Sequence, residues 1–347
     1  MVMKKILIKK PGSFTRLELV EEPTPQPLPG HALVRTHAAG VNFADVVVRL
    51  GLYPSAKKYV GWPITPGFEF SGVIEALGAD CDDSLCVGDA VYGVVRFFAY
   101  ATHVQVPLAQ LRKKPSNLNF EQAAAIPVAA FTAYYGLVVQ GQVKAGQRVL
   151  VHSAAGGVGS TLVQMAALLG ATVTGVVGSK DKVALVQSLG AQQVIVRGDG
   201  DWAKQARAAA PQGYDIALDA NGVATLADSY RLLRPTGRVV VYGAHSMLTR
   251  GSGRPNWLKL AWDFLRTPRF SPLDLTNDNK SVLAFNLSYL FDEQALLKSA
   301  FDQLNDWYKT GQLRVAELTS FPLADAAGAH RALQSGTTRG KLVLVSV

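Results

Sequence analysis

Cysteine is scarce in this chain of 347 residues, which contains only Cys81 and Cys86. Two thiols are too few for a disulfide framework or for a four-cysteine zinc site. The first residues, from Met1 to Lys5, lead into a strand pattern and not into the apolar core of a secretory signal. We therefore expect a reducing, cytoplasmic setting.

Blocks of like charge are also absent. The 35 lysines and arginines and the 26 aspartates and glutamates are scattered, and they leave a net charge of +9 without an arginine-rich block or a lysine tail. This distribution slightly favours an anionic ligand and argues against nucleic acid as a partner. The contents of 48% hydrophobic and 18% charged residues are those of an ordered globular protein. The length allows two domains, each with its own core.

Two stretches, Gln122 to Val143 and Val149 to Gly178, lack charged residues altogether and are long enough to span a membrane. The first contains Pro127 and several polar residues, and the second contains His152 and six glycines. These residues suit a buried helix and a buried strand-turn-helix better than they suit membrane spans.

The second uncharged stretch carries the clearest chemical signal. An apolar run ending at His152 is followed by the small residues Ala154-Ala155-Gly156-Gly157-Val158-Gly159 and then by apolar positions at helical spacing. In a dinucleotide-binding unit, such a turn lets the backbone approach a pyrophosphate at the helix N-terminus. Glycines that serve only a tight turn are the alternative. A second strand pattern over Gly170–Gly178, at the expected distance, favours the cofactor.

The composition divides the chain in two. Short strands with proline and glycine corners fill residues 4–104 and predict a β-rich, partly barrel-like domain. Beyond the glycine turn, helices alternate with strands, which specifies a parallel, doubly wound sheet. We place one domain at residues 1–121, completed by 290–347, and the other at 122–289. Six strands are expected in the second domain, beginning at Val149, Thr172, Gln193, Tyr214, Gly237 and Ser281.

These motifs together resemble the medium-chain dehydrogenase/reductase superfamily, and specifically its zinc-independent quinone oxidoreductase branch. The likeness rests on Ala39–Asp45, Arg49–Pro54 and the glycine turn. Within that branch, Trp257–Leu290 and Gly340–Val345 are similar to the vesicle amine transport protein VAT-1 group. The resemblance implies a GroES-like β-rich catalytic domain and a six-stranded Rossmann domain.

One departure from the zinc-dependent relatives bears on the chemistry. Those relatives place a cysteine at the position of Asn42 and a histidine at the position of Phe68, which precedes Glu69 here. An asparagine amide and a phenyl ring are not zinc ligands of the kind that thiolate and imidazole provide. We therefore expect no catalytic metal.

The resemblance points to Asn42 and Tyr53 as hydrogen-bond donors to the acceptor, with Phe68 and Val47 lining the space beside them. An enone or quinone that receives hydride at carbon develops negative charge on oxygen, so donors are needed more than a strong base. An Asn42 that bonds only the local backbone of a turn is the alternative. Val47 stands where related quinone oxidoreductases often carry a second tyrosine, which puts a preference for quinones in doubt.

The residues after the second strand indicate NADPH as the cofactor. Ser179, Lys180 and Lys182 suit a 2′-phosphate, and by resemblance Lys182 occupies the position of a phosphate-contacting lysine. Solvated surface lysines are the alternative, and Arg197 either adds a phosphate contact or faces water. The family pattern also assigns to the cofactor the turn and nicotinamide-side residues Ala155, Gly156, Gly157, Val158, Gly159, Gly243, Ala244, Phe285, Asn286 and Leu287. Thr132, in a helix expected to face the nicotinamide, is a further candidate contact, and a buried threonine that bonds its own helix backbone is the alternative.

The expected function is NADPH-dependent reduction of quinones or α,β-unsaturated carbonyls by zinc-free hydride transfer, in a homodimer. An enoyl-thioester reductase shares the fold and the cofactor and stays open. A VAT-1-like nucleotide-binding protein that acts through a membrane or protein partner is the non-enzymatic alternative. Four alternatives are open for the aromatic segment Asn256–Arg266: it covers the active site, lies in a dimer interface, contacts a membrane surface or packs on the sheet.

Overall fold

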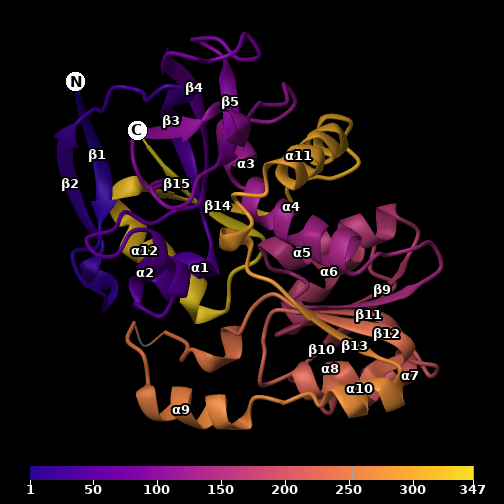
Figure 1. Ribbon diagram of the computed structural model, residues 1–347. Coiled ribbons are helices and arrows are strands. Elements are labelled where there is room, and N and C mark those ends of the chain that lie inside the picture. Colours follow the sequence, from indigo (N-terminus) through magenta and orange to yellow (C-terminus); the bar gives the residue numbers. More distant parts are fainter. Residues whose placement is uncertain (252, 347) are drawn as a thin grey trace. The chain divides into compact units, whose positions relative to one another are not determined.

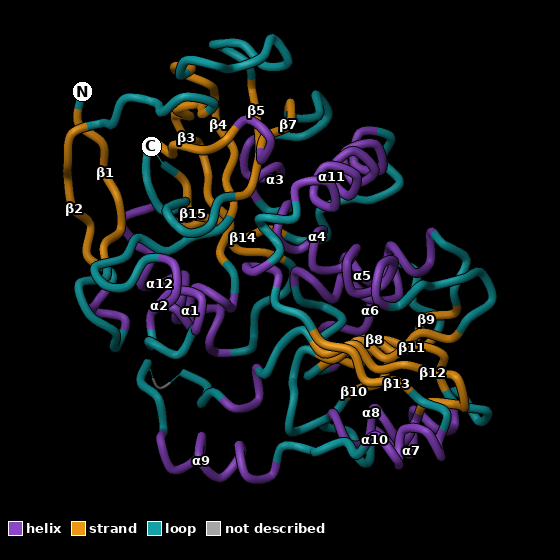
Figure 2. Tube along the Cα trace, viewed as in Figure 1, coloured by secondary structure: helices purple, strands orange, loops and turns teal. Residues whose placement is uncertain are grey.

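The computed structural model describes residues 1–251 and 253–346, and the chain divides into two compact units. Unit 1 comprises Met1–Phe131, Arg250–Arg254 and Leu287–Val347, and unit 2 comprises Thr132–Thr249 and Pro255–Asn286. Figure 1 labels their helices and strands, and Figure 2 distinguishes helices, strands and loops by colour.

Unit 1 is built mainly from strands. They are β1 (Val2–Leu7), β2 (Glu18–Pro23), β3 (His31–Val41), β4 (Glu69–Leu77), β5 (Ala90–Val94), β6 (His103–Pro107), β7 (Leu111–Lys113), β14 (Leu318–Pro322) and β15 (Lys341–Val345). Its helices are α1 (Phe43–Arg49), α2 (Pro54–Tyr59), α3 (Phe120–Ala124), α11 (Gln294–Lys309) and α12 (Ala326–Ser335), and α4 (Pro127–Tyr134) crosses into unit 2.

The main sheet of unit 1 has the strand order β14-β15-β3-β4-β5-β7, and β6 also pairs with β3. β15, from the C-terminal part of the chain, runs antiparallel to β3, with Leu342 opposite Val41 and Leu344 opposite Ala39. These four side chains are buried in one apolar core with residues of β4, β5 and β6. The pairing brings Lys341, the first residue of β15, next to the end of β3.

A fully buried arginine ties together distant segments of unit 1. The Arg49 guanidinium donates to the carbonyl oxygens of Gly12 at 2.7 Å and Gly253 at 2.9 Å, and to Gln334 Oε1 at 2.7 Å. It also lies over the Phe14 ring, 4.4 Å from its centroid. Burial lowers the pKa of Arg49 to about 10, which leaves the guanidinium charged at neutral pH.

Unit 2 contains the predicted alternation of strands and helices. Its strands are β8 (Arg148–His152), β9 (Thr172–Val177), β10 (Gln193–Val196), β11 (Tyr214–Asp219), β12 (Leu233–Val241) and β13 (Ser281–Ala284). Its helices are α5 (Gly157–Leu168), α6 (Val183–Ser188), α7 (Trp202–Ala209), α8 (Leu226–Leu232), α9 (Trp257–Arg266) and α10 (Pro272–Asp278).

The six strands of unit 2 form one parallel sheet in the order β10-β9-β8-β11-β12-β13. Helices α5 and α6 cover one face, and α7, α8 and α10 cover the other (Figure 1). The central strands β8 and β11 are buried on both sides, as a sheet covered on two faces requires. The predicted doubly wound Rossmann sheet is confirmed.

The two uncharged stretches fold into short elements. Residues 149–178 contain β8, α5 and β9, and residues 122–143 contain α4 and the π-helical turn Tyr135–Gln140. Over the described part of the chain, no helix combines the length and apolar character needed to cross a membrane.

Candidate functional site

In unit 2, the predicted cofactor residues gather along one edge of the sheet. All six strands are parallel, so the residues that follow them share the carboxyl edge. The strand order reverses between β8 and β11, and in sheets of this type a ligand binds at such a switch point. Predicted residues follow five of the strand ends: Gly156–Gly159 after β8, Ser179 after β9, Arg197 after β10, Gly243 and Ala244 after β12, and Phe285 and Asn286 after β13.

The glycine turn at the end of β8 is tightly packed on its inner side only. A Cβ on Gly159 would lie 2.1 Å from the carbonyl oxygen of Ser153, so no larger residue fits there without a shift of the backbone. Gly156, the N-cap of α5, and Gly157, its first residue, are instead partly exposed. The first N–H groups of a helix lack partners within it. This turn therefore offers backbone donors and helix-dipole charge to an anionic ligand.

Sequence reasoning missed Asn221, which lies beside this turn. Its Oδ1 accepts a hydrogen bond from Ser153 Oγ at 3.1 Å, which joins the residues that follow β8 and β11 across the switch point. Asn221 is 5% exposed, and its Nδ2 has no hydrogen-bond partner among the described residues. A buried amide left unpaired is costly, and an acceptor atom of a bound dinucleotide would satisfy it. The residues at this edge therefore fit a dinucleotide.

A buried polar network around Asp219 fixes the turn that follows β11. The Asp219 carboxylate accepts the Asn221 N–H at 2.8 Å, the Thr225 hydroxyl at 2.7 Å and the Ser229 hydroxyl at 3.0 Å. Ser229 Oγ also lies 2.8 Å from His152 Nε2, and burial lowers the pKa of His152, which favours a neutral ring. Serine, histidine and aspartate make up hydrolase triads, but these three side chains are fully buried. The network braces the turn after β11.

The residues after β9 differ in how much they are enclosed. Ser179 occupies the N-cap position of a short 3-10 helix, Lys180–Lys182. The Lys180 ammonium is largely exposed and pairs with Asp199 at 3.2 Å, whereas Lys182 is only 7% exposed. The backbone N–H of Arg197 donates to the carbonyl oxygen of Val177 at 2.9 Å and joins the ends of β10 and β9. Burial therefore restricts the side chain of Lys182, whereas the side chain of Lys180 extends into solvent.

The segments predicted at the nicotinamide end also meet within unit 2. The Phe285 ring packs edge-on against Tyr135 at 4.8 Å and lies 6.4 Å from the Tyr242 ring. A Cβ on Gly243 would lie 2.7 Å from the carbonyl oxygen of Ala220, so this turn also requires a glycine. Thr132 is 9% exposed on α4. Leu287 belongs to unit 1.

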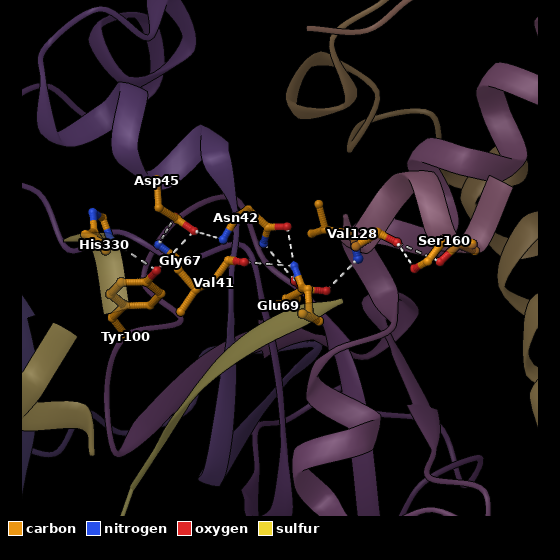
Figure 3. A network of polar contacts seen from close by, with 12 residues as sticks. Val41, Asn42, Asp45, Gly67, Glu69, Tyr100, Val128, Ser160 and His330 are labelled. Carbon is orange, nitrogen blue, oxygen red and sulfur yellow. Dashed lines mark hydrogen bonds and ion pairs between the residues drawn. The ribbon is translucent and has the colours of Figure 1, made fainter. Parts of the chain in front are cut away.

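In unit 1, Asn42 is held by a buried ion pair (Figure 3). Lys341 Nζ lies 2.6 Å from Glu69 Oε1, and both side chains are buried. Lys341 also donates to Asn42 Oδ1 and, at 3.1 Å, to the carbonyl oxygen of Val41. Asn42 Nδ2 donates to Glu69 Oε1 at 2.7 Å. The cation faces the amide oxygen and the anion faces the amide nitrogen, so the orientation of the Asn42 amide is fixed.

The surroundings of Glu69 explain why residue 40 is a glycine. Its Oε2 accepts the backbone N–H of Val128 at 2.7 Å, so the carboxylate is satisfied on both oxygens. A Cβ on Gly40 would lie 2.3 Å from Glu69 Oε1 and 2.6 Å from the carbonyl oxygen of Ala124. Only glycine leaves room for this carboxylate. Sequence reasoning assigned no role to Glu69 or Lys341, although a lone lysine before the apolar run Leu342–Val345 was a usable signal.

The other acceptor-side residues form an aromatic wall in unit 1. Phe68 is 3% exposed, and its ring lies 5.8 Å from Tyr53 and 5.0 Å from Phe97. Tyr53 is the N-cap of α2, and Val47 lies partly buried on α1. Asn42 and Phe68 do not fit a zinc ion. Within the described residues, no three histidine, cysteine, aspartate or glutamate side chains group to hold a metal, and both cysteines are free thiols.

Asp45 connects α1 to the segment that carries Phe68. This fully buried carboxylate accepts the N–H of Asn42 and the N–H of Gly67, both at 2.8 Å, and the Tyr100 hydroxyl at 3.2 Å. Tyr100 in turn lies 3.3 Å from His330 Nε2 (Figure 3). Burial raises the pKa of Asp45 to about 7, and the three hydrogen bonds oppose the rise.

Two segments of the sequence match known dehydrogenase families. Residues 189–344 match the zinc-binding dehydrogenase family, and residues 28–116 match the alcohol dehydrogenase GroES-like domain. The synaptic vesicle membrane protein VAT-1 homolog of Mus musculus is 33% identical over 337 residues, which are 96% of this chain and 81% of that protein.

Solved structures resemble the whole chain. The quinone oxidoreductase of Pseudomonas syringae pv. Tomato DC3000 is 32% identical with a TM-score of 0.84, and 99% of each chain is covered. The Escherichia coli quinone oxidoreductase complexed with NADPH is 26% identical with a TM-score of 0.85, again over 99% of each chain.

The Glu69–Lys341 pair yields a first prediction. Lys341→Met leaves a buried carboxylate without its cation and should lower the free energy of unfolding by about 3–5 kcal/mol. In the double variant Glu69→Gln/Lys341→Met, no buried charge is left alone, so the loss should be smaller than the sum of the two single losses. Urea unfolding of the four proteins measures both. Additive losses would show that the two side chains do not act as a pair.

Asp45 yields a prediction on pH. Its folded pKa of about 7 lies above the ordinary value of 3.8, so the folded state holds a proton that the unfolded state has released between these values. The stability of the wild type should therefore fall as pH rises from 4 to 7, by at most about 1.4 kcal/mol per pH unit from this group. Asp45→Asn should lack this contribution. Parallel pH profiles for the two proteins in urea unfolding would contradict the assignment.

Proposed function

Because the chain belongs to the medium-chain dehydrogenase/reductase superfamily, in the quinone oxidoreductase branch with the VAT-1 homologues, we propose that it reduces conjugated carbonyl compounds with NADPH. The acceptors are quinones or α,β-unsaturated carbonyls. The observation that carries the proposal is the switch point of unit 2, where a glycine turn at a helix N-terminus lies beside the unpaired amide donor of Asn221. The complex of the E. coli relative with NADPH supports the choice of cofactor.

Residues of unit 2 would hold the cofactor, which when bound supplies a hydride. The backbone N–H groups of Gly156–Gly159 receive the pyrophosphate, because the N-terminus of α5 favours negative charge. Ser179 and Lys182 receive the 2′-phosphate, where a hydroxyl and a cation replace the carboxylate that selects NADH. Asn221 donates its amide hydrogen at the same edge, and the backbone of Gly243 and Ala244 holds the carboxamide.

Residues of unit 1 would receive the acceptor. Hydride addition to an electrophilic carbon places negative charge on the conjugated oxygen, and Asn42 and Tyr53 donate hydrogen bonds to it. Lys341 lies at the amide oxygen of Asn42 and draws electron density from the amide, which makes its N–H a stronger donor. Glu69 uses one of the two amide hydrogens, and the other remains for the acceptor. Water supplies the proton that completes the reduction.

A metal is unnecessary for this chemistry. A zinc ion stabilises an alkoxide as a Lewis acid when the substrate is an alcohol or a saturated ketone. A conjugated acceptor instead spreads the charge over its own π-system, so amide and phenol donors suffice. Asn42 and Phe68 at the two ligand positions agree with this reaction and not with alcohol oxidation.

The cofactor assignment is tested by a matched pair of lysine variants. Loss of a charge-assisted phosphate contact costs on the order of 1.5–3 kcal/mol, so Lys182→Ala should raise the Kd for NADPH about tenfold or more. The Kd for NADH should stay nearly unchanged. Lys180→Ala should have a smaller effect, because that ammonium is exposed and paired with Asp199. Fluorescence titration of the wild type and both variants with each cofactor gives the six constants, and equal weakening of both cofactors in Lys182→Ala would refute the 2′-phosphate site.

The reaction class is tested with an acceptor panel on protein dialysed against a strong chelator. Oxidation of NADPH should persist with a quinone or an enone, and simple alcohols should not be oxidised. Metal analysis of the same sample should find substoichiometric zinc. Activity that disappears on chelation and returns with zinc would overturn the proposal. If only an enoyl thioester is reduced, the acceptor is a thioester and not a quinone or enone. NADPH binding without any turnover would support the non-enzymatic VAT-1-like function.

A further inference from the structure

Two adjacent aromatic residues of unit 1 hold a backbone conformation that residues with side chains rarely adopt. Phe97 has a φ of 69° and Phe98 a φ of 73°, in the left-handed region that favours glycine. Among the described non-glycine residues with positive φ, these two alone are neighbours in the chain. Bulky side chains are strained in this region, and such strain persists only where the surrounding structure fixes it. The contacts of this turn must therefore compensate for the strain.

Backbone hydrogen bonds fix this turn to the segment that carries Phe68. Four N–H groups from residues 95–100 donate to four consecutive carbonyl oxygens: Val95 to Phe68 at 2.9 Å, Phe98 to Thr65 at 3.0 Å, Ala99 to Gly67 at 3.3 Å and Tyr100 to Pro66 at 3.0 Å. The two left-handed residues lie inside this bonded span. The strained backbone is therefore held by the same bonds that place residues 95–100 beside residues 65–68.

The two rings of the turn have different surroundings. The Phe97 ring is fully buried, and its centroid lies 5.0 Å from that of Phe68, with an angle of 51° between the ring planes. The Phe98 ring is 41% exposed, and Lys5 Nζ lies 5.5 Å from its centroid. Phe97 therefore supports the Phe68 ring from the interior of unit 1, whereas Phe98 lies at the surface.

Both chain neighbours of Phe68 are tied to Asn42 (Figure 3). The Gly67 N–H donates to the Asp45 carboxylate, which also accepts the N–H of Asn42, both at 2.8 Å. On the other side, Glu69 Oε1 accepts Asn42 Nδ2 at 2.7 Å. These bonds fix the backbone of Phe68 relative to Asn42, so the freedom that remains to Phe68 is rotation of its side chain. Close packing of the Phe97 ring against it restricts that rotation.

We propose that Phe97 determines the acceptor specificity of the reductase site by holding the Phe68 ring in place. Because Phe97 is fully buried, it acts through Phe68 and is a positioning residue. A Phe68 ring that cannot retreat gives the space beside Asn42 and Tyr53 a fixed width, which favours acceptors with a small substituent at the electrophilic carbon. This inference rests on the proposed function, in which Asn42 and Tyr53 donate hydrogen bonds to the acceptor.

Kinetics with two enones that differ in one substituent test the proposal. At the electrophilic carbon, 3-penten-2-one carries a methyl group and 4-phenyl-3-buten-2-one carries a phenyl ring. Their intrinsic reactivities are the same for every variant, so a change in the ratio of their kcat/KM values reports on the site. Phe97→Leu removes the ring that supports Phe68 and should shift this ratio toward the phenyl compound about tenfold. Phe97→Met refills part of the space with a flexible chain and should cause a smaller shift in the same direction.

Phe98→Leu is the matched control, because it makes the same substitution in the same backbone conformation at the exposed ring. Its ratio should equal that of the wild type. Circular dichroism and an unchanged Kd for NADPH confirm that the variants are folded, and Phe97→Met decides if Phe97→Leu does not fold. An unchanged ratio in the folded Phe97 variants, or an equal shift in Phe98→Leu, would overturn this inference alone. A wild type that reduces no quinone or enone would overturn the proposed function and this inference with it.

Discussion

The buried contact between Glu69 and Lys341 is the constraint around which unit 1 is organised. Two charges withdrawn from water are costly unless each is hydrogen-bonded. Here the carboxylate also receives Asn42 and the N–H of Val128, and the ammonium also meets the carbonyl oxygen of Val41. The pair joins the start of β4 to the start of β15 and dictates a glycine at position 40. Because both charged groups contact Asn42, the orientation of its amide is fixed, as its proposed role as a hydrogen-bond donor requires.

In unit 2, hydrogen bonds and close contacts of backbone groups fix the two turns at the edge of the sheet. The turn after β8 is closed by the contact of Gly159 with Ser153, and the turn after β11 is held by the Asp219 carboxylate. Ser153 and Asn221 connect the two turns at the point where the strand order reverses. These buried contacts hold the polar groups of the two turns in fixed positions, as recognition of a cofactor requires. In the proposed function, the donors fixed in unit 1 would serve the acceptor, and those fixed in unit 2 would serve a phosphate.

The fold was predictable where its signals are local in sequence. Alternation of apolar runs and helices specified the six strands of unit 2, and the small residues before α5 marked its turn. Strand β12 begins at Leu233, earlier than the predicted Gly237, because Leu233 pairs with Tyr214 although Pro235 follows it. Contacts between residues far apart in the chain, such as Lys341 with Glu69, leave no periodic signal. The exposure of apolar side chains on α9, such as Trp257 and Leu258, was also hidden, because an amphipathic pattern shows two faces but not which one is buried.

In the proposed reaction, hydride passes directly from NADPH to a conjugated carbon without a metal. The most direct measurement uses NADPH carrying deuterium at the transferable position of C4, an enone acceptor and protein dialysed against a chelator. One deuterium is expected in the product, at the carbon β to the carbonyl, with the added proton at the α carbon taken from solvent. A product without deuterium, or labelling that requires added zinc, would contradict it.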